Sequence, residues 1–141
     1  MTIQEQEHIK QKGYKEAMHY IANAKDYLQK AGIDEDDRYK SKKYVRTACG
    51  TAYLGVLEAL NTYLRLKNPD VVKSKEPKTI DFYRRNLAKE NRKVLSSLNT
   101  VYTFLHIDGY YQGVLEMMAI KIGFQRAQEI IDLIKPAGVA Q

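Results

Sequence analysis

Residues 47–64 read TACGTAYLGVLEALNTYL, and this stretch decides the fold class of the 141-residue chain. It carries one charged residue, Glu58, while its apolar and small residues recur at helical spacing. Glu58 and Asn61 disfavour a membrane span, and the stretch is only about as long as the shortest spans. Two interior glycines, Gly50 and Gly55, each disfavour a helix by about 0.5–1 kcal/mol relative to alanine. We therefore predict a buried central helix that a neighbour approaches closely, either within the chain or in a dimer.

Three groups of helix-breaking and capping residues divide the chain into helical segments. They fall near residues 32–38, 68–79 and 106–110, where glycine, proline and aspartate gather. Proline cannot continue a helix interior, and glycine and aspartate are typical of helix ends. Each segment between the breaks has helical periodicity over about 25 residues, or about 40 Å, and no alternating pattern predicts a strand. We therefore predict an all-α, up-down-up-down four-helix bundle of long antiparallel helices.

The composition is typical of one globular domain. Hydrophobic residues make up 44% and charged residues 28% of the chain, which excludes an intrinsically disordered protein. A single domain should span residues 1–141, with 1–12 a candidate flexible N-terminus and 136–141 a C-terminal tail. Cys49 is the only cysteine, which excludes an intrachain disulfide. Residues 1–12 lack the apolar core of a secretory signal, so we expect a cytoplasmic protein without a membrane partner.

The net charge of +6 is confined to one part of the chain. Residues 65–93 contain ten Lys or Arg and four Asp or Glu, whereas the remainder has equal numbers of each sign. On the predicted third helix, four basic side chains share one face near the N-terminus, where the helix dipole also attracts anions. The candidate anion- or nucleic-acid-binding residues are Arg85, Lys89, Arg92 and Lys93. The alternative is an ordinary solvated helix face that binds nothing.

The last predicted helix has two apolar stripes instead of one. The first contains Tyr111, Leu115, Met118 and Ile122, and the second contains Met117, Ile120, Phe124, Ala127, Ile131 and Ile134. One stripe can face the core, which leaves the other in need of a partner. We therefore predict a homodimer, with Ile120, Phe124 and Ile131 as the candidate self-association residues.

Several common catalytic and metal-binding patterns are missing from the sequence. A carboxylate-bridged di-iron bundle needs Glu-x-x-His pairs on two helices, but the pairs at residues 5–8 and 16–19 lie on one segment. The sequence has no glycine-rich phosphate loop and no serine nucleophile elbow. The adjacent Tyr110 and Tyr111 form either a stacking surface or an anchor at a helix start. We therefore predict a non-enzymatic interaction protein without catalytic residues, metal or cofactor.

Two segments resemble the HEPN superfamily of bacterial helical bundles. They are residues 17–24, AMHYIANA, and residues 44–53, YVRTACGTAY, in which an amphipathic helix precedes one rich in small residues. The resemblance extends over about residues 14–106. The ribonucleases of that superfamily carry an arginine, then about four to six residues, then a histidine. No arginine in this sequence is followed by a histidine at that spacing. The resemblance therefore implies an alternative function without nuclease activity, in which the protein binds RNA or nucleotides or pairs with a nucleotidyltransferase.

Overall fold

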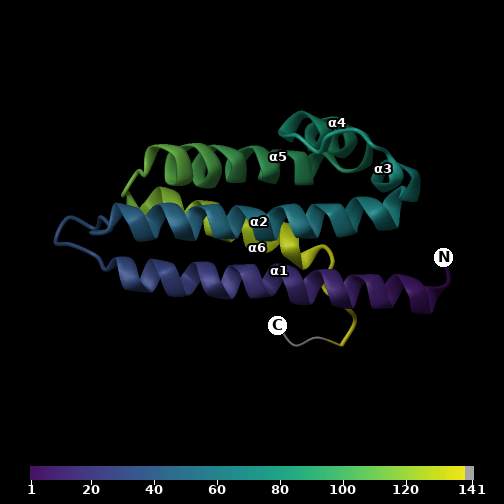
Figure 1. Ribbon diagram of the computed structural model, residues 1–141, viewed down its shortest axis with the longest axis horizontal. Helices are drawn as coiled ribbons and strands as arrows, with labels where there is room; N and C mark the ends of the chain where they lie inside the picture. The colour runs from purple at the N-terminus through teal and green to yellow at the C-terminus, as the bar shows by residue number, and fades with distance from the viewer. Residues whose placement is uncertain (139–141) are drawn as a thin grey trace.

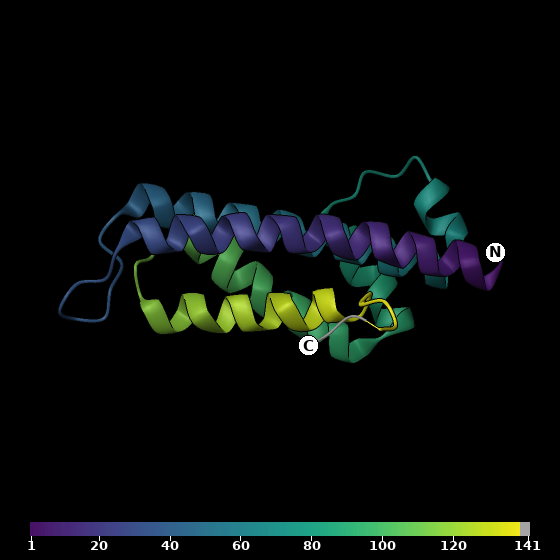
Figure 2. The ribbon, with the colours of Figure 1, turned by 90° about the horizontal axis from the view of Figure 1, so that it is seen from below.

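Six α-helices and one π-helix make up the regular structure of residues 1–138, which the computed structural model describes apart from the side chain of Val72. In chain order they are α1 (Ile3–Ala31), α2 (Lys42–Lys67), α3 (Pro69–Lys73), α4 (Ile80–Glu90), α5 (Arg92–Val101), the π-helix η1 (Tyr102–Gln112) and α6 (Met117–Asp132). The long helices α1 and α2 lie antiparallel and side by side, and α5 and α6 lie along them (Figures 1 and 2). No strand forms within residues 1–138, so the predicted all-helical fold class is confirmed.

The predicted third helix is divided, which corrects the expectation of four continuous helices. Asn91 has extended backbone angles, φ −164° and ψ 100°, and it ends α4 and begins α5. Its side-chain oxygen accepts a hydrogen bond from the backbone nitrogen of Val94 at 3.2 Å, and such caps favour a new helix start. The break at Asn91 therefore turns α4 relative to α5, and η1 continues α5 with wider turns.

The break predicted at residues 106–110 is wrong, because the helix continues to Gln112. Gly109 is buried, and a Cβ atom there would lie 2.8 Å from the Cβ of Cys49 on α2. This glycine therefore permits close helix packing and does not make a turn. The chain turns instead at Gly113, whose positive φ of 66° is the left-handed conformation typical of helix C-termini.

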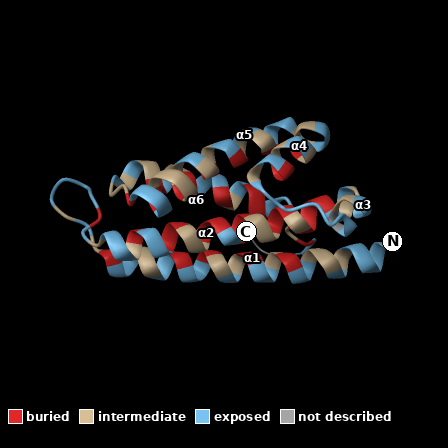
Figure 3. Ribbon diagram, turned by 45° about the horizontal axis from the view of Figure 1, so that its top comes forward, coloured by how far each residue is buried: buried red, intermediate tan, exposed pale blue. Residues whose placement is uncertain are grey.

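The small-residue face of α2 is buried within the chain. Ala48, Ala52 and Ala59 have no exposed surface, and buried residues recur along the whole of α2 (Figure 3). A Cβ atom at Gly55 would lie 3.1 Å from the backbone oxygen of Ala17 on α1. Of the two interpretations of these small residues, intrachain packing is therefore confirmed. Among the described residues, no helix has the length and hydrophobicity needed to cross a membrane.

Two loops meet at one end of the molecule and fix the start of α2 beside the end of η1. The backbone nitrogen of Tyr39 donates to the oxygen of Leu115 at 2.9 Å, and Arg38 forms an ion pair with Glu116 at 3.2 Å. The nitrogen of Met117 donates to the oxygen of Asp37 at 3.4 Å. The α1–α2 and η1–α6 connections are therefore joined to each other, which sets the register of η1 against α2.

The N-terminal segment differs from its expectation, because α1 begins at Ile3 and includes most of residues 1–12. The hydroxyl oxygen of Thr2 accepts from the backbone nitrogen of Glu5 at 3.1 Å, which caps the helix. Of the predicted tail at 136–141, Pro136 is buried, and residues 139–141 lie outside the described part of the chain.

Candidate functional site

An open groove with a volume of about 450 Å³ lies between α2 and η1. We call it the α2–η1 groove, and its lining consists of Arg46, Thr47, Gly50, Thr51, Leu54, His106 and Tyr110. Arg46, Gly50 and Leu54 are four residues apart on α2, so they follow one another along one helix face. A Cβ atom at Gly50 would lie 2.9 Å from the ring of Tyr110, so the absence of a side chain there makes room for that ring.

Three aromatic side chains of η1 form a row that continues out of the groove. Tyr102, His106 and Tyr110 are four residues apart, and η1 presents them on one side. The His106 ring centroid lies 5.2 Å from that of Tyr102 and 5.9 Å from that of Tyr110, and the His106 and Tyr110 planes differ by 11°. Beneath the row, Tyr53 of α2 stacks on His106 at 4.5 Å. We call Tyr102, His106 and Tyr110 the aromatic row.

An arginine lies at each end of the aromatic row. The guanidinium carbon of Arg46 is 5.9 Å from the Tyr110 ring centroid, and its Nε donates to the backbone oxygen of Tyr110 at 2.8 Å. At the other end, the guanidinium carbon of Arg84 is 4.9 Å from the Tyr102 ring centroid. The Nε of Arg84 donates to Asn99 at 2.9 Å. Both guanidinium groups are therefore oriented by hydrogen bonds to neutral partners, and Arg84 also lies 3.8 Å from the exposed carboxylate of Asp81.

The protonation states in the groove keep its aromatic surface uncharged. Burial lowers the pKa of the His106 imidazole from its ordinary value of 6.5, so the ring is neutral at pH 7. Burial raises the pKa of Tyr53 to about 12, so its hydroxyl keeps its proton. No residue that lines the groove is acidic. The arrangement therefore suits a planar, uncharged ring that carries a negative group on either side.

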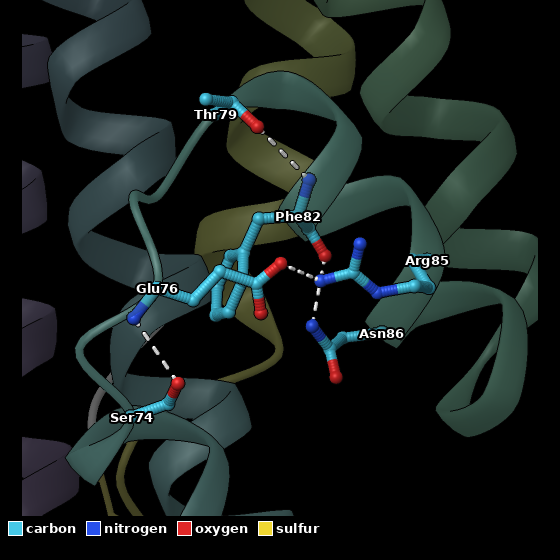
Figure 4. Close-up of polar contacts among 6 residues, drawn as sticks. All are labelled: Ser74, Glu76, Thr79, Phe82, Arg85 and Asn86. Carbon is cyan, nitrogen blue, oxygen red and sulfur yellow. Dashed lines mark hydrogen bonds and ion pairs between the residues drawn. The ribbon is translucent and has the colours of Figure 1, made fainter.

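The predicted basic residues do not form one helix face. Arg85 and Lys89 lie on α4, whereas Arg92 and Lys93 lie in the first turn of α5, with the break at Asn91 between them. Figure 4 shows that Arg85 bonds to Glu76, a residue of the α3–α4 connection. That connection is held near α4 because Thr79 caps the helix, and Glu76 therefore offsets the charge of Arg85.

The predicted self-association residues lie mostly in the core, which corrects their assignment to a surface. Ile120 and Ile131 are 1% and 0% exposed, and Phe124 is half-buried. Since α6 packs against both α2 and α5, its second stripe is the one that faces the interior. Met118 of the first stripe is the large apolar side chain of α6 that is exposed, at 67%.

The sequence does not show that Arg46, Arg84 and His106 belong to one site. The spacing of Tyr102, His106 and Tyr110 was visible in the sequence, but an interval of four residues is also typical of core positions. Tyr110 and Tyr111, the candidate stacking surface, lie on the outside of the molecule, 41% and 65% exposed. The missing information was the contact between α2 and η1.

Comparisons with known proteins place the chain among proteins of unknown function. The sequence profile of one family, described as Domain of unknown function (DUF5618), matches residues 12–136. A solved structure, a protein of unknown function from Dyadobacter fermentans, is 40% identical and has a TM-score of 0.76. That match covers 89% of this chain and 94% of the other. No curated protein matches the chain. The whole α2–η1 groove lies within the residues that the family profile matches.

Proposed function

The chain belongs to the family described as Domain of unknown function (DUF5618), and we propose that it is a non-enzymatic protein that binds RNA or nucleotides in the α2–η1 groove. One observation carries this proposal, namely the aromatic row with an arginine at each end. The resemblance of residues 17–24 and 44–53 to the HEPN superfamily supports the same function.

The chemistry of the groove matches the two parts of a nucleotide. Stacking of a base on an aromatic side chain contributes about 1–3 kcal/mol, and every base has a face that can stack. Guanidinium groups bind phosphate with paired hydrogen bonds, which a lysine cannot reproduce. Tyr110 is 41% exposed and Arg46 forms no ion pair within residues 1–138, so both can reach a ligand.

Calorimetric titration of hexa-adenylate into the protein and into Tyr110→Ala tests the proposal. Because one stacking surface is lost, we expect the variant to bind at least about fivefold more weakly. Tyr27→Ala is the matched control, since Tyr27 is a partly exposed tyrosine of α1 that is not among the groove residues. Equal affinity for the native protein and Tyr110→Ala would contradict the proposed site.

The proposal assigns no catalysis to the groove, because His106 is its one histidine and no carboxylate lines it. General acid–base cleavage of RNA needs a proton acceptor and a proton donor, and no carboxylate or second histidine lines the groove. We expect labelled RNA to stay intact with the purified protein. Cleavage that survives repeated purification and disappears in His106→Phe would show that the protein is a nuclease.

A second proposal is that the protein self-associates. Leu54, Tyr110 and Tyr111 are 50%, 41% and 65% exposed and lie together at the edge of the groove. Exposed apolar side chains that are contiguous are typical of interaction surfaces. A second copy on this patch would cover Tyr110, so self-association and ligand binding compete for the same surface. The patch takes the place of the α6 surface that the sequence predicts.

A further inference from the structure

The aromatic row extends beyond the groove, which is the starting point of this inference. The groove contains Arg46, His106 and Tyr110, whereas Tyr102 and Arg84 lie past its end. The guanidinium carbon of Arg84 lies 4.9 Å from the Tyr102 ring centroid, and the Tyr102 and His106 ring centroids are 5.2 Å apart. The His106 and Tyr110 ring centroids are 5.9 Å apart, and the guanidinium carbon of Arg46 lies 5.9 Å from the Tyr110 centroid. Three rings therefore separate the two guanidinium groups.

A mononucleotide cannot use this whole surface. Its phosphate is attached next to its only base, so it can bind one arginine while its base stacks on the adjoining ring. The inner rings are covered, His106 by Tyr53 and Tyr102 by Arg84, so a base can stack only on Tyr110, which is 41% exposed. A polynucleotide repeats base and phosphate along its length, so it can stack a base on Tyr110 and place phosphates at both ends of the row. The strand must be single, because the bases of a duplex stack on each other and leave no face for a side chain.

The surroundings of Arg84 fit contact with a phosphate. Its side chain is 38% exposed, and its one ionic partner within residues 1–138 is Asp81, at 3.8 Å. The side chain of Asp81 is 85% exposed, so this pair is weak and a phosphate can replace it. The Nε of Arg84 remains bonded to Asn99, which leaves the outer guanidinium nitrogens for the ligand.

We infer that the site takes a single-stranded polynucleotide, with a base on the exposed ring of Tyr110 and phosphates at Arg46 and Arg84. This inference rests on the proposed function and narrows it, because it excludes a mononucleotide as the complete ligand. It also assigns a binding role to Arg84, which lies outside the groove and outside the predicted set of basic residues.

The experiment compares ligands of increasing length by calorimetric titration. AMP, di-adenylate, tetra-adenylate and octa-adenylate are titrated into the native protein, with an adenylate–uridylate duplex as the double-stranded probe. We expect tetra-adenylate to bind at least about tenfold more tightly than AMP, and the duplex to bind more weakly than octa-adenylate. Equal affinity for AMP and tetra-adenylate would overturn the inference but not the proposed function. No binding of any ligand would overturn both.

Arg84→Gln provides the second arm, because the glutamine amide can still donate to Asn99, while the charge and the two outer guanidinium nitrogens are lost. We expect about two- to fivefold weaker binding of tetra-adenylate with AMP affinity unchanged. The slope of the logarithm of the tetra-adenylate binding constant against the logarithm of salt concentration should become less steep by about 0.7. This is the value for one phosphate contact on a single strand. Arg126→Gln is the matched control, since Arg126 bonds to Glu129 on its own helix. An unchanged salt dependence, or equal loss for AMP, in a variant with native thermal stability would overturn the role of Arg84.

Discussion

Two glycines at close approaches, Gly109 and Gly50, have different neighbours and therefore different tolerances. A Cβ atom at Gly109 would lie 2.8 Å from the Cβ of Cys49 and 3.1 Å from the backbone oxygen of Phe104. Neither atom can move without a shift of its helix. At Gly50 the nearest atoms belong to the exposed ring of Tyr110, which can rotate away. The first position is therefore important for stability and the second for the shape of the groove.

Substitution of these glycines should separate the two effects. We expect Gly109→Ala to lower the free energy of unfolding by about 1–3 kcal/mol, the usual effect of overpacking. Gly50→Ala should leave the free energy of unfolding within about 1 kcal/mol of native, because helix propensity offsets the shift of Tyr110. Urea denaturation measures both free energies. Under conditions where both variants are folded, binding of hexa-adenylate should fall for Gly50→Ala and stay native for Gly109→Ala. A Gly109→Ala protein of native stability would contradict the packing of η1 on α2.

His106 should couple stability to pH on the acidic side. Its folded-state pKa is lowered from 6.5 by burial, so the unfolded chain binds its proton more readily. The contribution of the neutral ring is therefore fully present above pH 6.5 and is lost as pH falls through the folded-state pKa. In urea denaturation between about pH 7.5 and 5, His106→Phe should lose less stability than the native protein, because phenylalanine stacks but cannot titrate. Identical pH dependence would show that His106 is not desolvated.

At the scale of the elements, short polar side chains decide where helices begin. Asn91 separates α4 from α5, and its two side-chain atoms have different partners. The oxygen accepts from the nitrogen of Val94 at 3.2 Å, and the amide nitrogen donates to the hydroxyl of Tyr63 at 3.4 Å. This residue therefore both caps α5 and ties the α4–α5 junction to α2.

Replacement of Asn91 tests the helix cap separately from the hydrogen bond to Tyr63. We expect Asn91→Ala to destabilise the protein by about 1 kcal/mol, since the first turn of α5 loses its acceptor. Asn91→Asp keeps an acceptor for Val94 and removes only the amide donor to Tyr63, so it should be less destabilising. Thermal denaturation followed by circular dichroism gives the comparison. Equal loss in the two variants would assign the stability to the Tyr63 contact.

The division between α4 and α5 also bears on the basic segment, Arg85, Lys89, Arg92 and Lys93. Because these residues lie on two helices and Arg85 bonds to Glu76, we expect the segment to be a solvated surface. The double variant Arg85→Glu, Lys89→Glu should therefore bind hexa-adenylate as the native protein does at physiological salt. Binding at low salt can fall modestly through long-range charge alone. A large loss at physiological salt, without loss in Tyr110→Ala, would move the binding site to the basic segment.

At the scale of the whole molecule, the joined loops at one end hold α2 and η1 in register. The contacts of residues 37–39 with residues 115–117 keep Leu54, Tyr110 and Tyr111 on one open face. That face carries three large exposed side chains, whereas the apolar stripe of α6 with Ile120 is covered by its own chain. Any contact between two copies is therefore expected on the groove side.

Sedimentation velocity at tens of micromolar tests this expectation. We expect the native protein to sediment as a dimer and the double variant Leu54→Gln, Tyr111→Gln to sediment as a monomer, because apolar contact area is lost. Met118→Gln is the control, since Met118 is an apolar side chain that is 67% exposed, at least as much as Leu54 and Tyr111, and does not line the groove. A native protein that is monomeric at every concentration would contradict self-association, and dissociation caused only by Met118→Gln would place the interface on α6.

The sequence by itself determined the helical class and the buried central helix. Apolar periodicity is a local property that follows from 3.6 residues per turn, and Pro69 cannot continue α2, so it begins the separate helix α3. The same periodicity could not show which stripe of α6 faces the core, because both stripes satisfy it. It also could not distinguish Gly109, a packing position, from Gly113, a turn, since both are glycines near a helix end.

Only the tertiary structure decided where the candidate site lies. Arg46, Arg84 and His106 come from α2, α4 and η1, and their proximity depends on how these elements pack. Periodicity relates residues a few positions apart, whereas this site joins residues separated by as many as 64 positions, as in the bond from Arg46 to Tyr110. Contacts of that range result from the burial of whole helix faces, so the local pattern of the chain does not contain them.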